Sequence, residues 1–137
     1  MANYAKIIQR ASGPFPYKYT IIFGENMAST YNLAIDQGTD FSNTFTLKDS
    51  SNTVRNLTGY TGKAQLRRSY ASTSNVAFTI NIADPTNGNV IVTLSNAVTA
   101  NLKYGRYVYD LELTLTSANT IERAFEGIVT VFPEVTR

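Results

Sequence analysis

The chain contains no histidine, no cysteine and no tryptophan. The absence of cysteine excludes disulfide frameworks and thiolate chemistry. The absence of histidine excludes Ser-His-Asp and Cys-His arrangements for nucleophilic catalysis. We therefore expect a protein that is not an enzyme, with no catalytic residues, no cofactor and no metal site, and that acts through its surfaces.

Charge and long apolar runs are also scarce. Twelve basic and ten acidic residues give a net charge of only +2, which argues against the concentrated basic patch of a nucleic-acid-binding surface. No window approaches the roughly 20 apolar residues that span a bilayer, and the N-terminus lacks a signal-peptide pattern. We expect neither nucleic acid nor membrane among the partners.

What the sequence does contain is regular alternation of apolar and polar residues. Runs such as Phe41–Lys48, Val76–Ile82 and Tyr107–Leu115 alternate with period two, which predicts strands with one wet face. About seven to eight such strands with almost no helix predict an all-β, immunoglobulin-like β-sandwich over residues 31–137. A closed barrel is the alternative arrangement.

Two details of this pattern concern single residues. Asn43 is a polar residue in the inward phase of the Phe41–Lys48 run. Ser95 is placed to cap a single helical turn, with three apolar residues expected on its buried side: Ala97, Val98 and Leu102.

Residues 1–30 differ from the rest and predict an extended N-terminal arm. Its glycine and prolines at positions 13, 14 and 16 break any helix, and Tyr17–Phe23 is a β-prone run that is apolar in both phases. The arm is thus expected to carry one strand. That strand either pairs with an edge of its own sheet or adds to a neighbouring chain through main-chain hydrogen bonds.

The beginning of the chain leaves a second alternative open. Met27 is followed by Ala-Ser-Thr, a sequence typical of a protein start, so Met1 and Met27 both stand as candidates for the natural start. We expect deletion of residues 1–26 to leave a folded monomer that no longer assembles.

Acidic residues offer two candidate sites, each with a simpler interpretation. Asp36 and Asp40 bracket a glycine-containing turn, which suits either calcium or ordinary turn chemistry. Asp110 and Glu112 lie about 7 Å apart on one strand face, as paired carboxylates for glycoside hydrolysis would. We interpret them instead as cross-strand partners of basic residues, namely Lys63, Arg67 or Arg68.

Several short segments occur together in a recognisable order. They are Asp36-Gln-Gly-Thr-Asp40-Phe41, Phe45-Thr-Leu-Lys-Asp49, Asn56-Leu-Thr-Gly-Tyr60, Ala64-Gln-Leu-Arg-Arg68, Gly105-Arg-Tyr-Val-Tyr-Asp-Leu-Glu-Leu113 and Glu126-Gly127. This pattern, over about residues 31–132, resembles the immunoglobulin-like domain of tailed-phage virion structural proteins. It is similar to the N-terminal domain of baseplate upper proteins and to small stand-alone structural proteins of cyanophages.

The resemblance implies a role in mounting one part of a virion on another. The expected function is an adaptor that docks tail, baseplate or fibre components through its arm and sandwich surfaces. Capsid decoration or a neck position is the alternative, and a carbohydrate-binding module for host-surface glycan is an alternative from another class. The expected location is the virion, assembled in the bacterial host cytoplasm.

The same resemblance implies other virion proteins as partners and several copies of this chain in a symmetric assembly. Larger relatives continue into a receptor-binding or fibre-linking region, whereas this chain ends at Arg137, which favours an adaptor, decoration or neck component. Aromatic and apolar residues of the arm and the loops are the contact candidates. They are Tyr4, Phe15, Tyr17, Tyr19, Ile21, Ile22, Phe23, Tyr70 and Tyr104.

Overall fold

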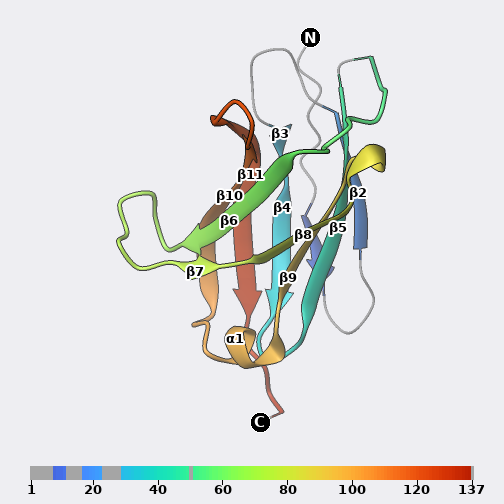
Figure 1. Ribbon diagram of the computed structural model, residues 1–137. Helices are drawn as coiled ribbons and strands as arrows, with labels where there is room; N and C mark the ends of the chain where they lie inside the picture. The colour runs from blue at the N-terminus through green and yellow to red at the C-terminus, as the bar shows by residue number, and fades with distance from the viewer. Residues whose placement is uncertain (1–7, 12–16, 23–28, 50, 137) are drawn as a thin grey trace.

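Two β-sheets packed face to face make up the chain in this computed structural model (Figure 1). It describes residues 8–11, 17–22, 29–49 and 51–136, and the side chains from residue 30 onward. The strands of the larger sheet follow the order β1 (Ile8–Ala11), β4 (Asn32–Asp36), β11 (Thr120–Phe132), β10 (Gly105–Leu115), β6 (Tyr60–Arg67) and β7 (Val76–Ala77). β3 (Ser29–Thr30) belongs to the same sheet and pairs with β11. The smaller sheet runs β2 (Tyr17–Ile22), β5 (Phe41–Lys48), β9 (Asn89–Leu94), β8 (Thr79–Asp84).

The order of the strands is that of an immunoglobulin-like sandwich. In that fold, whose strands are lettered A to G along the chain, B, E and D share one sheet and C, F and G the other. Here β5, β9 and β8 take the places of B, E and D, and β6, β10 and β11 take those of C, F and G. The predicted all-β sandwich is confirmed.

Alternation along β5 shows how the core forms. Phe41, Phe45 and Leu47 are fully buried, whereas the intervening threonines are only half-buried. The ring of Phe45 lies 4.4 Å, centroid to centroid, from that of Phe125 on β11, so the contact joins the two sheets. Each such buried side chain stabilises the fold by about 1.5–3 kcal/mol relative to an exposed one.

The chain changes sheets at Phe78. Sequence alternation predicts one strand over Val76–Ile82, but the structure divides it into β7, which pairs with β6, and β8, which pairs with β9. Between them the amide of Phe78 donates to the carbonyl of Ala64 while its side chain is buried. The two halves keep the same alternation, which is why the pattern alone did not reveal the crossing.

The helical turn after β9 is confirmed, but its buried side is not the predicted one. In α1 (Asn96–Ala100), the hydroxyl of Ser95 accepts a hydrogen bond from the amide of Val98. Leu102 is buried as expected, whereas Ala97 and Val98 are exposed. Thr99 is buried instead, because its hydroxyl donates to the carbonyl of Thr39 at 2.7 Å.

A close approach of two backbones marks the junction between β3 and β4. The Cβ of any larger residue at Gly127 would lie 1.9 Å from the carbonyl oxygen of Tyr31, so only glycine fits there. That same carbonyl accepts a hydrogen bond from the hydroxyl of Tyr109 at 2.6 Å. The side chain of Asn32 accepts from the amide of Ile128 at 3.0 Å, where the parallel pairing with β11 is interrupted.

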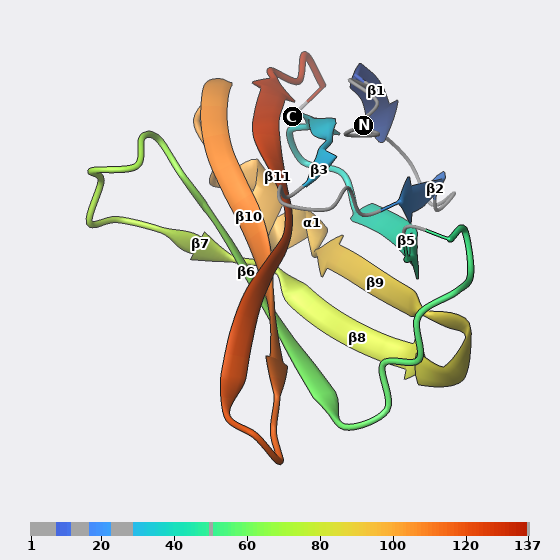
Figure 2. The ribbon, with the colours of Figure 1, turned by 90° about the horizontal axis from the view of Figure 1, so that it is seen from above.

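β1 and β2 lie at one flank of the sandwich (Figure 2), whereas β3 pairs with β11. The single predicted strand is present as β2, and β1 and β3 are additional. β1 pairs in parallel with β4, and β2 pairs in parallel with β5. Each of these two strands is the outermost one of its sheet on this flank.

Candidate protein-interaction surface

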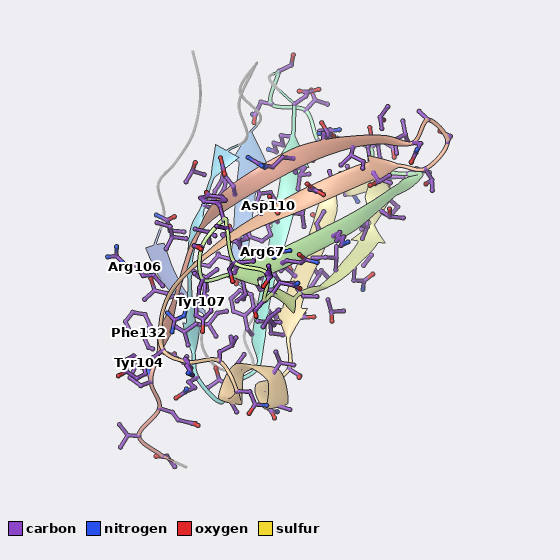
Figure 3. The ribbon with its side chains drawn as sticks, turned by 90° about the vertical axis from the view of Figure 1, so that its left-hand side faces the viewer. Arg67, Tyr104, Arg106, Tyr107, Asp110 and Phe132 are labelled. Carbon is purple, nitrogen blue, oxygen red and sulfur yellow. The ribbon has the colours of Figure 1, made fainter. Side chains whose placement is uncertain are left out.

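Two of the predicted contact residues are exposed tyrosines near the outer face of the larger sheet. Tyr70, in the loop between β6 and β7, is 75% exposed, and Tyr104, just before β10, is 66% exposed. In Figure 2 the loop that carries Tyr70 projects from the sandwich beside β10. Figure 3 shows Tyr104 and Phe132 at the end of this face where β10 begins and β11 ends.

The other predicted contact residues belong to the arm. Tyr17, Tyr19, Ile21 and Ile22 form much of β2, whose main chain pairs with β5, and their side chains lie outside the described part of the structure. Tyr4, Phe15 and Phe23 lie outside the described residues altogether.

Two hollows on the outer face share Tyr70 as a wall. The first, of about 190 Å³, lies over β6 and β10 and is lined by Gln65, Arg67, Tyr70, Val108, Tyr109 and Asp110. The second, of about 300 Å³, lies over β3, β4 and β11 and is lined by Thr30, Asn32, Tyr70, Glu126, Gly127 and Ile128. Because β10 separates β6 from β11, Tyr70 must reach across the sheet between the two hollows. We call this region the Tyr70 face.

The loop that bears Tyr70 is held by the two arginines before it. Arg67 donates to the carbonyl of Ser72 at 2.6 Å and to the side chain of Gln65 at 3.0 Å. Arg68 donates to the carbonyls of Tyr104 and Arg106 and lies 4.5 Å from the ring centre of Tyr107. The Tyr70 loop and the segment that leads into β10 are therefore tied to each other.

Asp110 on the Tyr70 face pairs with a basic residue of a neighbouring strand, but not with a predicted one. Asp110 pairs with Arg123 of β11 at 3.3 Å, and Arg123 also lies 3.5 Å from Glu126. The prediction of Lys63, Arg67 or Arg68 as the partner of Asp110 was wrong, because the residue opposite Asp110 on β6 is Gln65. All three charged groups are partly exposed, and such pairs contribute at most about 1 kcal/mol.

Asp36 and Asp40 belong to a turn, in which the carbonyl of Asp36 accepts from the amide and the hydroxyl of Thr39. The carboxylate of Asp40 accepts hydrogen bonds from both the amide and the side chain of Asn96, at 2.8 and 3.0 Å, which holds the start of α1. Glu112 lies opposite Lys63 in the pairing of β10 with β6, which is one of the predicted cross-strand neighbours. Among the described residues, no three His, Cys, Asp or Glu side chains gather closely enough to hold a metal ion.

Apolar groups complete the surface, and the sequence pattern hinted at one of them. Ile128 is 39% exposed beside the second hollow, in the wet phase of β11 between two buried residues. An isoleucine in that phase was the available signal for a contact residue. In the core, where the ring of Tyr31 packs against Phe45 and Phe125, burial raises the pKa of its hydroxyl, because the ionised form would lose hydration.

No helix in the described part of the chain is long and apolar enough to cross a membrane. The arrangement as a whole offers an aromatic ring between two shallow polar-rimmed hollows, with an exposed isoleucine and a second tyrosine nearby. An aromatic anchor with a polar rim is the usual composition of a protein-binding surface.

No protein-family model matches the chain, and no curated protein matches it in sequence. Among solved structures it is similar to the N-terminal domain of phage TP901-1 ORF48, with TM-score 0.52 and 13% identity over 87% of this chain and 98% of that one. It also aligns with InlP of Listeria monocytogenes (TM-score 0.42, 14% identity, 77% of this chain, 28% of that chain). A third similar structure is the cysteine protease inhibitor EhICP2 from Entamoeba histolytica (TM-score 0.38, 15% identity, 89% of this chain, 100% of that chain).

The first of these similarities is the informative one. It extends over nearly the full length of both chains, so the two share the sandwich fold. At 13% identity the likeness concerns the fold alone. The other two alignments are too weak to argue from.

Proposed function

We propose that this chain is a non-enzymatic structural component of a phage particle, where it docks other virion proteins. The observation that carries the proposal is the likeness, along almost the whole of both chains, to a domain of a phage protein. The composition supports it, because a chain without histidine or cysteine is poorly equipped for catalysis but well suited to binding.

Within the particle, we propose an adaptor position in the tail or baseplate, or next to a fibre. Capsid decoration and a neck position would use the same fold on a different lattice. The adaptor, decoration and neck positions all require a rigid domain with at least one docking surface and a way for copies of the chain to associate. The Tyr70 face is the docking surface that we propose, and the flank of β1 and β2 is the means of joining.

The physical case for the Tyr70 face rests on preorganisation. A tyrosine has few rotatable bonds, so its contact area costs little conformational entropy when a partner binds. The arginines at positions 67 and 68 already fix the loop that carries it. A partner therefore meets a surface that needs little ordering, which favours affinity.

Purified particles of the phage that encodes the chain provide the test. Particles are banded on a density gradient, washed in high salt, and analysed by quantitative mass spectrometry and by immunogold labelling with antibodies against the chain. We expect the chain in a fixed ratio to the major structural proteins, with gold at one substructure that identifies the position. Particles that lack the chain after washing would contradict the proposal.

A pair of matched variants tests the surface itself. Tyr70→Ala removes the ring between the hollows, whereas Ile121→Ala removes an apolar side chain of similar exposure (64%) on a different part of the larger sheet. We expect Tyr70→Ala to reduce incorporation into particles at least about tenfold, as a hot-spot tyrosine would. The Ile121→Ala protein should incorporate normally. Equal incorporation of both would remove the Tyr70 face from the account.

One observation favours a second function from another class. The exposed Tyr70 ring beside polar side chains such as Gln65 and Asp110 also suits stacking against a sugar. A glycan array probed with the purified chain decides between the two. A specific hit that is lost in Tyr70→Ala would favour a carbohydrate-binding module for host-surface glycan over a docking surface for protein.

A further inference from the structure

β1 and β2 repeat, one strand further out, the path of β4 and β5. Each residue of β1 lies opposite the residue 24 positions later, from Ile8 opposite Asn32 to Ala11 opposite Ile35. Each residue of β2 lies opposite the residue 26 positions later, from Tyr17 opposite Asn43 to Ile22 opposite Lys48. We call β1 and β2 together the outer arch, and β4 and β5 together the inner arch.

The outer arch is attached through main-chain pairing at two sheet edges. Both pairings are parallel, and the pairing partners of β1 and β2 are only β4 and β5, respectively, among the described strands. An edge strand presents the same N–H and C=O groups to any incoming strand, whichever molecule supplies it. Addition of a strand to an exposed edge is a common way for one protein to bind another.

The inner arch contains a buried polar side chain without hydrogen bonds at the position where β2 begins to pair. Asn43, opposite Tyr17, is completely buried, and neither its side-chain oxygen nor its nitrogen has a hydrogen-bond partner among the described residues. A buried amide without partners destabilises the state that buries it. When β2 leaves, β5 becomes the edge of its sheet and water can reach this amide. Asn43 therefore lowers the barrier to detachment of the outer arch.

We propose that the outer arch is exchanged between copies of this chain, so that the arch of one copy lies on the inner arch of the next. Exchange preserves every pairing that the arch makes within its own chain, so its free-energy cost is small. The inference rests on the proposed function, because a particle that gathers many copies raises the effective concentration of neighbouring arches. The partner is a second copy of this chain, and the surface is the edge formed by β4 and β5.

Paired cysteines test the exchange in a chain that has no cysteine of its own. Lys18 and Thr44 are opposite each other in the pairing of β2 with β5. Chains carrying Lys18→Cys are mixed with differently tagged chains carrying Thr44→Cys and treated with a short bismaleimide. Exchange predicts a covalent dimer that contains both tags.

The matched control uses a pair from the interior of the larger sheet. Lys63 and Glu112 are opposite each other in β6 and β10. Chains carrying Lys63→Cys mixed with chains carrying Glu112→Cys should give no dimer, whereas both substitutions in one chain should give an internal cross-link. Exchange is overturned if the Lys18→Cys and Thr44→Cys mixture gives no more dimer than this control mixture.

A second variant tests the part assigned to Asn43. Asn43→Leu keeps the branching of the side chain and removes both orphan polar atoms. We expect the mixed-tag dimer to form about tenfold more slowly, because detachment no longer exposes an amide that gains hydration. The control Asn81→Leu, at an exposed position on β8, should leave the rate unchanged. An unchanged rate in Asn43→Leu would remove Asn43 from the mechanism.

The outcomes separate this inference from the proposed function. A chain that is found in particles but gives no mixed-tag dimer keeps its structural role and loses the exchange. A chain that forms the dimer but is absent from particles keeps the exchange and loses the virion role.

Discussion

The body of the sandwich, from β4 to β11, contains the core that joins the two sheets, whereas the outer arch supplies one edge strand to each sheet. In the body, alternate side chains such as Phe45 and Phe125 join the two sheets, so its stability depends on this particular sequence. The outer arch is joined by parallel main-chain pairing to two edges. This difference in position is the basis of our proposal that the body stays with its own chain and that the arch is exchanged.

Removal of the arm should have the largest effect, because it should abolish assembly and leave the folding of the body intact. We expect a chain without residues 1–26 to keep the cooperative unfolding of the body and to lose assembly entirely, because the pairings of β1 and β2 go with them. Size-exclusion chromatography with light scattering measures the assembly, and circular dichroism measures the unfolding. A truncated chain that assembles as the full chain does would mean that the arm has no part in joining copies.

A cavity in the body should lower stability, whereas removal of the arm should abolish assembly. Phe45→Ala removes a fully buried ring that contacts Phe125 of the facing sheet, and we expect it to lower the free energy of unfolding by about 3–5 kcal/mol. Chemical denaturation measures the loss. Tyr70→Ala is the matched control, because its ring is 75% exposed and its removal should change stability by less than about 0.5 kcal/mol. Similar losses in both variants would contradict the packing described for the core.

Replacement of Asn43 should stabilise the chain where body and arch meet. Asn43→Leu replaces two buried, unpartnered polar atoms by apolar atoms on a similar skeleton. We expect the free energy of unfolding to rise by about 1–2 kcal/mol. Equilibrium denaturation of this variant beside Asn81→Leu, which alters an exposed amide, isolates the effect of burial. A loss of stability in Asn43→Leu would show that the amide is satisfied in solution.

The smallest effect is expected from the charges on the Tyr70 face. Arg123→Ala removes the partner of both Asp110 and Glu126, and we expect a loss of at most about 1 kcal/mol. Because salt screens exposed pairs, the difference from the unaltered chain should shrink further at 1 M salt. Thermal unfolding at low and high salt measures it, and a loss that does not depend on salt would assign Arg123 a packing role instead.

The same contrast explains how much of the fold could be read from the sequence. Alternation in Phe41–Lys48 and Tyr107–Leu115 predicted strands that the structure contains as β5 and β10. The prediction was possible because a strand with one buried and one exposed face alternates apolar and polar residues in its sequence. β1 was missed, since Ile8–Ala11 has no such period and becomes a strand only through pairing with β4. The change of sheet at Phe78 was missed because both halves share one alternation.

The candidate surface was predictable only in part. Tyr70 could be picked out as an aromatic residue in a polar loop, and the structure places it between two hollows. The residues that form the hollows with it come from strands far apart in the sequence, so only the strand order brings Asn32 and Ile128 to its side. The partner of Asp110 was missed for another reason: Arg123 lies opposite Glu112 and reaches Asp110 diagonally, beside a register shift between Leu111 and Glu112 that the sequence does not reveal.

A cryo-electron microscopy reconstruction of the assembled particle tests the central claim most directly, because it locates both the Tyr70 face and the outer arch. The account predicts several symmetry-related copies of this chain, each with another virion protein over Tyr70 and with its inner arch covered by β1 and β2 of a neighbour. A particle without the chain, or one in which the Tyr70 face and the flank of β4 and β5 make no contact with any other molecule, would contradict it.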